Sequence, residues 1–225
     1  DLTIQAFNFA ERFRTPVILL SDATVAHMRE KVVLKDLPVV NRTVPDCNPK
    51  EYKPFKAGEN KVPPMASFGS DYIFHATSSM HTETGSYGGT PQHADALIRR
   101  LHDKIYDYID EITITKEFNT KDAEILFVSY GVSARSAREA VNMLRNQGIK
   151  AGLLQLNTIW PFPDKKVLKA GAFAKAIFVP ELNLGQVVNE VKRVINGKTE
   201  VYGINKVDTR ILSPYEIIER VKEVL

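Results

Sequence analysis

The 225-residue chain combines 44% hydrophobic with 25% charged residues, a globular composition large enough for one large domain or two modest ones. Its formal net charge is only +3 and its basic residues are dispersed, which argues against a nucleic-acid-binding surface. No apolar stretch approaches the roughly 20 residues needed to cross a bilayer, and Asp1-Leu2-Thr3 does not resemble a signal peptide. We therefore expect a soluble, cytoplasmic protein without a membrane partner.

Cys47 is the only cysteine in the sequence, so no intramolecular disulfide can form. One thiolate is also far too few for an iron–sulfur cluster, which takes about four cysteine ligands. Any such cluster must therefore lie elsewhere. Because no histidine or arginine adjoins Cys47 to activate its thiol, we assign it no catalytic role.

The amino-terminal part is typical of the end of a larger α/β domain. Apolar residues recur at helical spacing over 2–13 and lead into 16–20, a short apolar run that predicts a buried strand. Asp22 then predicts the cap of a short helix over 23–29. Extended runs are expected next, at 32–34 and 39–40. Since a domain seldom opens on a core helix, we expect further residues of this domain upstream.

Regular periodicity disappears between residues 41 and 90, a segment that we call the connection. Five prolines interrupt it, at positions 45, 49, 54, 63 and 64. A structureless segment of this length is uncommon in a compact domain, so we expect an ordered segment that wraps over a neighbouring surface. Aromatic residues distinguish it from a disordered linker and are its expected anchors: Tyr52, Phe55, Phe68, Tyr72 and Phe74.

Thr90 and Pro91 give the N-cap and first-turn signals of a long helix. Apolar residues keep to one face of this helix as far as Ile112, while the other face is charged. We expect a single helix over 90–112 that links two domains.

The rest of the sequence alternates strand and helix patterns. Apolar runs predict four strands, at 124–130, 152–156, 174–179 and 200–204. Amphipathic patterns predict the helices between them, and the last helix opens with the capping box Ser213-Pro214-Tyr215-Glu216. This order predicts an α/β fold with a mostly parallel sheet and helices on both faces. We expect it to form a compact domain at 119–225.

The turn at 130–133 joins the first of these strands to a helix, where backbone N–H groups can hold a phosphate or a carboxylate. The sequence has neither the glycine-rich fingerprint of dinucleotide-binding folds nor a phosphate-binding loop of the ATPase type. We therefore favour an ordinary turn, in which Ser133 caps the helix, over an anion site.

Two polar clusters are candidate sites. His75, His81 and Glu83 have side chains that could bind a metal or move protons, but their spacing fits no standard metal motif, so we favour a hydrogen-bonded loop at an interface. Glu181, Asn183 and Gln186 follow the third strand, at the sheet edge where open α/β sheets often bind ligands. Asn183 also reads as a plain helix cap, and we favour a cap with a subunit contact over a ligand site.

Five segments, in order, resemble the alpha subunits of 2-oxoacid:ferredoxin oxidoreductases, the 2-oxoglutarate type in particular. They are 14–22 with the following 26–32, the His-rich segment 75–85, the turn 148–154, Trp160-Pro161-Phe162-Pro163 and Pro180-Glu181-Leu182-Asn183-Leu184-Gly185-Gln186. The resemblance extends over essentially the whole chain. It implies that 1–40 ends a thiamine diphosphate-family pyrimidine-binding domain, that 41–118 is an extended connection with a linking helix, and that 119–225 is a domain like the carboxy-terminal domain of transketolases.

The resemblance also implies an activity: thiamine diphosphate-dependent oxidative decarboxylation of a 2-oxoacid to acyl-coenzyme A and CO₂, with reduction of ferredoxin. The chain contains no Gly-Asp-Gly diphosphate signature and no cysteine cluster. Thiamine diphosphate, Mg and the iron–sulfur cluster are therefore expected on partner subunits, the beta subunit among them. We assign no catalytic, cofactor-binding or metal residue to the chain and expect it to be inactive alone.

The chain is instead expected to serve assembly. The candidate interface residues are Tyr52, Phe68, Tyr72, His75, His81, Glu83, Gly85, Glu181, Asn183 and Gln186. The alternative is a non-catalytic binding or assembly module that reuses the transketolase-like domain. A nucleotide-binding protein would need phosphate motifs that the sequence does not supply.

Overall fold

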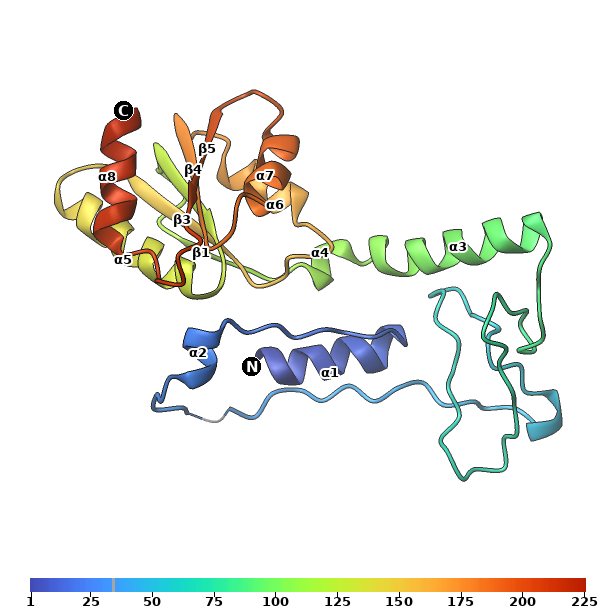
Figure 1. Ribbon diagram of the computed structural model, residues 1–225. Coiled ribbons are helices and arrows are strands. Elements are labelled where there is room, and N and C mark those ends of the chain that lie inside the picture. The colour runs from blue at the N-terminus through green and yellow to red at the C-terminus, as the bar shows by residue number, and fades with distance from the viewer. Residues whose placement is uncertain (34) are drawn as a thin grey trace. The chain divides into compact units, whose positions relative to one another are not determined.

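The computed structural model describes residues 1–33 and 35–225, which form two compact units (Figure 1). The first unit consists of 1–20 and 30–109, and the second of 21–29 and 110–225. Leu34, at the end of the extended run expected at 32–34, lies outside the described residues.

The first unit contains helix α1 (Leu2–Phe13), the single 3₁₀ turn η1 (Pro49–Glu51) and helix α3 (Pro91–Tyr106). The helix predicted over 2–13 is confirmed. It ends at Arg14, whose left-handed conformation (φ 44°) stops the helix. The Phe13 side chain at its last turn is only 2% exposed and packs on the ring of Tyr108, with centroids 5.4 Å apart.

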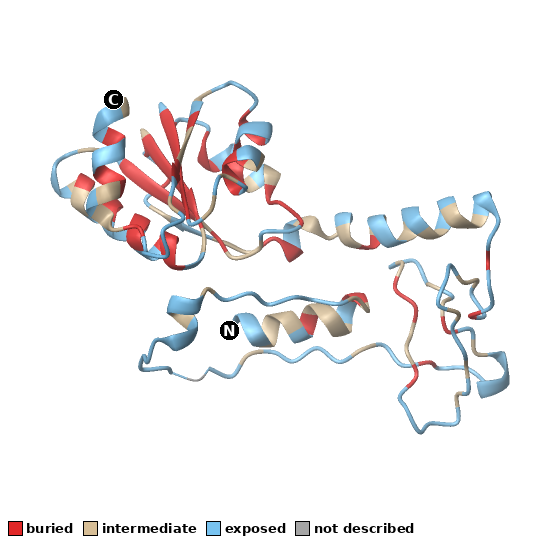
Figure 2. Cartoon of the chain, viewed as in Figure 1, coloured by how far each residue is buried: buried red, intermediate tan, exposed pale blue. Residues whose placement is uncertain are grey.

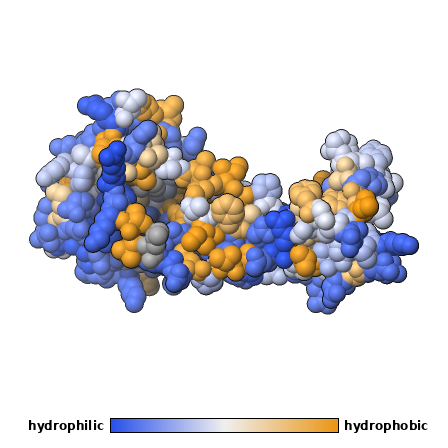
Figure 3. All heavy atoms as spheres, turned by 90° about the horizontal axis from the view of Figure 1, so that it is seen from below, coloured by the Kyte–Doolittle hydropathy of each residue, from blue (hydrophilic) through white to orange (hydrophobic). Residues whose placement is uncertain are grey.

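The prediction of a strand at 16–20 is wrong. These residues have no strand structure, and Ile18 and Leu20 are 79% and 78% exposed. Val39 and Val40 likewise form no strand. An apolar run becomes a strand only beside a backbone that completes its hydrogen bonds, and the part of the chain described here supplies none. Figure 3 shows that hydrophobic residues form patches on this face of the molecule.

The helix predicted over 90–112 is interrupted. Thr90 is its N-cap, as expected, and accepts the N–H of His93 at 3.3 Å. Helix α3 ends at Tyr106, however, and a separate turn, α4, follows at Ile109–Ile112. The break lies at Tyr108, whose ring packs on Phe13, a contact that helical periodicity does not encode. The boundary between the two units falls at this turn, after Ile109.

The connection is held by the hydroxyl groups of its tyrosines. Tyr52 donates to the Pro64 carbonyl at 3.1 Å and accepts the N–H of Ala66 at 3.2 Å, while Tyr72 donates to the Cys47 carbonyl at 2.9 Å. The ring of Tyr52 also packs on those of Tyr72 and Phe74, with centroid distances of 5.1 and 5.7 Å. Phe68 stays outside this cluster and is 92% exposed.

The second unit is a five-stranded sheet in the order β1-β3-β2-β4-β5. Its strands are β1 (Thr115–Phe118), β2 (Ile125–Ser129), β3 (Ala151–Leu156), β4 (Ala176–Glu181) and β5 (Glu200–Asn205). Strands β3, β2, β4 and β5 run parallel, and β1 pairs with β3 antiparallel. The predicted α/β fold with a mostly parallel sheet is confirmed.

Helices cover both faces of this sheet (Figure 1). Helices α5 (Gly131–Asn146) and α8 (Pro214–Val224) lie on one face, and α6 (Asp164–Ala170) and α7 (Val187–Ile195) on the other. The short helix α2 (Ala23–His27) packs on α5. The central strands β2, β3 and β4 are mostly red for burial in Figure 2, because each face of the sheet packs into its own hydrophobic core.

Two details of the second unit differ from expectation. Strand β1 lies in a stretch that the sequence pattern assigned to the linking segment, because its residues Thr-Lys-Glu-Phe carry no apolar run. Ser133 does not cap the helix after β2: helix α5 already begins at Gly131, so Ser133 is buried within its first turn. The capping box of α8 is confirmed. Among the described residues, no helix has the length and apolar character needed to cross a membrane.

Candidate functional site

The sheet of the second unit has a switch point between β2 and β4, because the chain leaves β2 for β3 on one side and then crosses to β4 on the other. Open α/β sheets bind ligands at the carboxyl ends of the strands at such a point. Here the two strand ends are tied together, since the Ser129 hydroxyl donates to the Pro180 carbonyl at 2.7 Å. Tyr130 follows β2 at this edge, and Glu181 and Asn183 lie at the end of β4.

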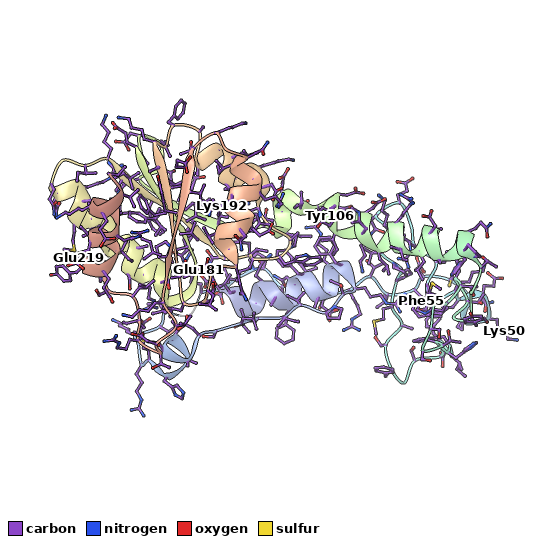
Figure 4. All side chains as sticks on the ribbon, turned by 45° about the horizontal axis from the view of Figure 1, so that its top comes forward. Lys50, Phe55, Tyr106, Glu181, Lys192 and Glu219 are labelled. Atoms are coloured by element: carbon purple, nitrogen blue, oxygen red, sulfur yellow. The ribbon has the colours of Figure 1, made fainter. Side chains whose placement is uncertain are left out.

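Glu181, labelled in Figure 4, is fully buried at this edge. Its carboxylate accepts the N–H groups of Gln186, Val187 and Val188, at 3.2, 3.0 and 3.0 Å. These are the first N–H groups of helix α7, which have no partner within the helix. The negative charge also lies at the positive end of the helix dipole. Glu181 therefore caps α7.

Asn183 and Tyr130 complete the polar cluster around Glu181. The Asn183 amide donates to the Glu181 carboxylate at 2.9 Å and to the Tyr130 oxygen at 2.8 Å, and the Tyr130 hydroxyl donates to Glu181 at 3.4 Å. Burial and the charge of Glu181 raise the pKa of Tyr130, which keeps its hydroxyl protonated as a donor. The Asn183 carbonyl accepts the N–H groups of Gly185 and Gln186, at 2.7 and 3.1 Å, which fixes the turn before α7. The N-cap position of α7 is Gln186, so the expectation that Asn183 is its cap is wrong.

Helix α5 also has a carboxylate at its N-terminus. Asp22 accepts the N–H of Val132 at 2.9 Å through one oxygen and the N–H of Val25, in α2, at 3.0 Å through the other. Gly131 makes room for it: its φ is +55°, and a Cβ there would lie 2.8 Å from the Asp22 oxygen. The turn at 130–133 is therefore a capped turn, as favoured, but its cap is Asp22 and not Ser133.

These contacts define what the edge can do. A phosphate or carboxylate ligand at a switch point is commonly bound by the N–H groups of a helix N-terminus. In the described part of the chain, those of Val132, Val187 and Val188 already donate to carboxylates of the chain itself. The polar residues at this edge therefore stabilise the turns of the sheet. The contact of Asp22 with α5 was not predicted, because the sequence around Asp22 carries no signal of it.

The loop at 75–85 belongs to the first unit and is a tight turn. Thr82 donates its N–H to the Ser86 carbonyl at 2.8 Å, and His81 forms an isolated β-bridge with Tyr87. Gly85 is required, because its φ is +89° and a Cβ would lie 1.9 Å from the His75 carbonyl oxygen. The loop is thus fixed by its backbone.

The side-chain contacts of this loop indicate a structural role. The His81 ring lies 3.7 Å from the ring of Phe55, and the His81 carbonyl is hydrogen-bonded to the His93 ring at 2.8 Å. Glu83 pairs with Lys53 at 3.5 Å on the surface, and His75 is exposed. Among the residues that the structure describes, no three His, Cys, Asp or Glu side chains are grouped to hold a metal ion.

The chain matches two protein-family models. Residues 1–94 match the thiamine diphosphate-binding region of pyruvate flavodoxin/ferredoxin oxidoreductases, and residues 123–217 match core domain II of pyruvate:ferredoxin oxidoreductases. Between them the two matches span most of the chain.

Curated relatives and a solved structure agree with these matches. The 2-oxoglutarate synthase subunit KorA of Methanothermobacter marburgensis is 39% identical over 98% of the chain and 60% of its own length. That of Methanocaldococcus jannaschii is 41% identical over 96% of the chain and 58% of its own length. The 2-oxoglutarate:ferredoxin oxidoreductase of Magnetococcus marinus, with 2-oxoglutarate, coenzyme A and succinyl-CoA bound, superposes with a TM-score of 0.81, at 26% identity, over 96% of this chain and 38% of that one.

The chain thus spans about three-fifths of the length of the curated relatives. The similarity predicted from its sequence segments is confirmed: the chain belongs to the 2-oxoacid:ferredoxin oxidoreductase family and corresponds to part of the family's alpha subunits.

Proposed function

We propose that the chain is part of the alpha subunit of an oxidoreductase that decarboxylates a 2-oxoacid, forms an acyl-coenzyme A and reduces ferredoxin. The observation that carries this proposal is the 39–41% identity to 2-oxoglutarate synthase subunits over nearly the whole chain. Identity to ketoisovalerate oxidoreductase subunits is lower, 28% over the whole chain. We therefore propose 2-oxoglutarate as the substrate. The relative solved with 2-oxoglutarate and coenzyme A bound supports both ligands.

Thiamine diphosphate belongs to the proposal because the family model over 1–94 describes a region that binds it. We place its diphosphate end, the magnesium ion and the iron–sulfur cluster on partner chains. Within the described residues no side chains are grouped for a metal ion, and the N-termini of α5 and α7 already hold carboxylates. These residues do not fit a diphosphate with its magnesium, so we derive no catalytic step through the cofactor.

We propose that this part of the subunit serves assembly with a beta subunit in the cytoplasm. The first 40 residues would end the pyrimidine-binding domain, 41–118 would form the extended connection, and 119–225 the transketolase-like domain. Phe68 is the strongest candidate for the interface, because a phenylalanine that is 92% exposed gains most from being covered by a partner. Tyr52, Tyr72 and the loop at 75–85, the other candidates, lie in the same connection.

The experiment is to produce the chain together with the remaining coding sequence and its neighbouring subunits. Ferredoxin reduction that requires coenzyme A is then measured with 2-oxoglutarate, pyruvate and 2-oxoisovalerate. We expect turnover with 2-oxoglutarate to exceed that with the other two acids at least tenfold. Turnover with pyruvate or 2-oxoisovalerate alone would overturn the substrate, and a lack of turnover with all three in a correctly assembled complex would overturn the activity.

A non-catalytic assembly module is the second candidate, and the two occupied helix N-termini favour it for the second unit. Copurification distinguishes the two functions. Elution with a chain that contains thiamine diphosphate supports the oxidoreductase subunit, whereas a stable solitary monomer supports the module.

A further inference from the structure

Three cations gather in the first unit. Arg14 is the C-cap of α1, and Arg100 and Lys104 lie one turn apart on α3. Lys104 is only 4% exposed, and Arg14 and Arg100 are half-buried. Buried charges are costly unless they are paired, so their partners decide what the cluster does.

The described contacts of these three side chains are to backbone carbonyls. Lys104 donates to the Arg14 carbonyl at 3.2 Å, Arg100 to the Lys61 carbonyl at 3.1 Å, and Arg14 to the carbonyls of Pro54 and Pro64. Among the described residues no carboxylate pairs with any of the three. This contrasts with nearby Lys61, which pairs with Asp103 and Asp107.

The cluster is electrostatically unbalanced as a result. Burial, together with the charges of Arg100 and Arg14, lowers the pKa of Lys104 to about 8. Burial also lowers the pKa of Arg14, and Arg100 and Arg42 lower it further, against a rise caused by Tyr52. An anion placed beside Arg14 would offset the electrostatic repulsion among all three cations.

A cavity of about 370 Å³ opens beside Arg14. This volume falls in the range of about 300–1,000 Å³ that is usual for small-molecule sites. Its wall is largely apolar, with Val62, Pro63 and Met65, and also presents the hydroxyl-bearing residues Thr15 and Thr43. The other cation of the wall, Arg42, is neutralised by Glu11. Arg14 is therefore the wall cation whose charge no described carboxylate balances.

The geometry of Arg14 selects the class of anion. Both of its described hydrogen bonds leave from Nη1, and its guanidinium also lies over the ring of Phe55, 5.1 Å from the centroid (Phe55 is labelled in Figure 4). No described contact uses Nε or Nη2, the pair of donors that binds a carboxylate side-on. The apolar wall disfavours a hydrated dianion such as phosphate.

We propose that this cavity binds a small carboxylate with a short apolar body, which pairs with Arg14, while Arg100 and Lys104 supply the surrounding positive potential. The site is distinct from the sheet edge of the second unit and does not depend on the substrate proposed above.

The test uses the full chain and three probes: butyrate, the neutral isostere butyramide, and inorganic phosphate at equal ionic strength. Calorimetric titration should show butyrate binding at least tenfold more tightly than butyramide and unaffected by phosphate. Equal binding of butyrate and butyramide would mean that the cavity is merely apolar, and competition by phosphate would show general anion attraction. Either result would overturn the proposal.

Matched variants on α3 separate this site from general charge effects. Arg100→Gln removes a cation of the cluster, whereas Arg99→Gln removes its exposed neighbour, which pairs with Asp95. We expect butyrate affinity to fall roughly tenfold in the first variant and to stay unchanged in the second, as a half-buried charge interacts through a low effective dielectric. Equal affinities in the two variants would overturn the proposal.

Lys104 offers a readout that a purely structural role would not move. Butyrate bound at Arg14 should raise the pKa of Lys104 from about 8, as followed by NMR of the ¹³C-labelled lysine side chain. A titration of Lys104 that is the same with and without saturating butyrate would contradict the site even if calorimetry detects binding.

Discussion

The carboxylate of Asp22 accepts the N–H of Val132 at 2.9 Å, although the two residues are 110 positions apart in the chain. Through its other oxygen the same side chain caps its own helix, α2. One carboxylate thus satisfies donors at two helix N-termini, and it fastens the segment 21–29 to the sheet domain, with which that segment is grouped.

Replacing Asp22 with Ala should therefore weaken the start of α5. An N-cap residue contributes about 0.5–2 kcal/mol, and we expect the opening free energy of the Val132 amide to fall by about 1–2 kcal/mol. Native-state hydrogen exchange measures this directly. Asp36→Ala, at an exposed position, is the control and should leave that amide unchanged. Equal exchange in the two variants would show that the Asp22 contact does not hold α5.

Gly131 and Gly148 provide a matched pair at the two ends of α5, since both have positive φ, +55° and +81°. A Cβ on Gly131 would meet the Asp22 carboxylate at 2.8 Å, whereas a Cβ on Gly148 would meet nothing within 4 Å. Both Ala variants should pay a similar backbone cost of about 1 kcal/mol. Only Gly131→Ala should also displace Asp22. Its free energy of unfolding in urea should therefore be about 1 kcal/mol lower than that of Gly148→Ala.

The buried carboxylate of Glu181 predicts a larger effect. Glu181→Gln keeps the shape but turns one oxygen into an NH₂ group, which cannot accept a hydrogen bond. Because Val187 donates to one carboxylate oxygen, and Gln186 and Val188 donate to the other, at least one of these buried N–H groups loses its acceptor. Leaving buried donors unpaired costs about 2–4 kcal/mol in total, which denaturant unfolding can measure. Glu190→Gln, on the exposed side of the same helix, should change stability by less than about 0.5 kcal/mol. A loss in Glu181→Gln no larger than in Glu190→Gln would rule out the capping role.

Four strands of the second unit could be predicted, because a continuous run of apolar residues in the sequence marks each of them. Strand β4 is a continuous run of buried residues, as expected for a parallel strand covered on both faces. Strand β1 has the burial pattern of an edge strand, with two exposed residues in its centre, and carries no such local signal. The run at 16–20 has the composition of a strand but lacks a neighbour, and composition does not report on neighbours.

The candidate site likewise has residues that the local sequence marks and residues that only the structure brings together. Glu181 and Asn183 were singled out because both follow a predictable strand, and the backbone N–H groups that they accept lie no more than seven positions further along the chain. The roles of Asp22, Arg14 and Lys104 depend on contacts between residues far apart in the chain: Lys104 and Arg14 are 90 positions apart. No spacing rule joins such residues, so the structure was needed to find them.

Lys104 makes stability depend on pH. Its pKa is lowered from 10.5 to about 8 in the folded chain, so the unfolded chain binds this proton more tightly. The free energy of unfolding should therefore rise as pH increases from about 8 to about 10.5, by up to about 3 kcal/mol. Lys104→Met removes this contribution, and unfolding of the two proteins at pH 7.5, 9 and 10 checks it. Parallel pH profiles for the two proteins would contradict the lowered pKa.

Phe68 tests the proposed interface without disturbing the fold of the isolated chain. Tyr72 is less suitable, because its hydroxyl holds the Cys47 carbonyl and its ring packs on Tyr52. Phe68 is 92% exposed, so Phe68→Ala should leave the stability of the chain within about 0.5 kcal/mol. If a partner subunit buries this ring, the same substitution should weaken association by about 1.5–3 kcal/mol.

The measurement is the dissociation constant of the assembled complex, with Phe173→Ala as the control at another exposed phenylalanine, 79% exposed, in the second unit. Hydrogen exchange of the loop at 75–85, the other proposed part of the interface, should slow on assembly if the partner covers it. Unaltered affinity of Phe68→Ala, combined with unaltered exchange in this loop, would place the partner elsewhere on the chain.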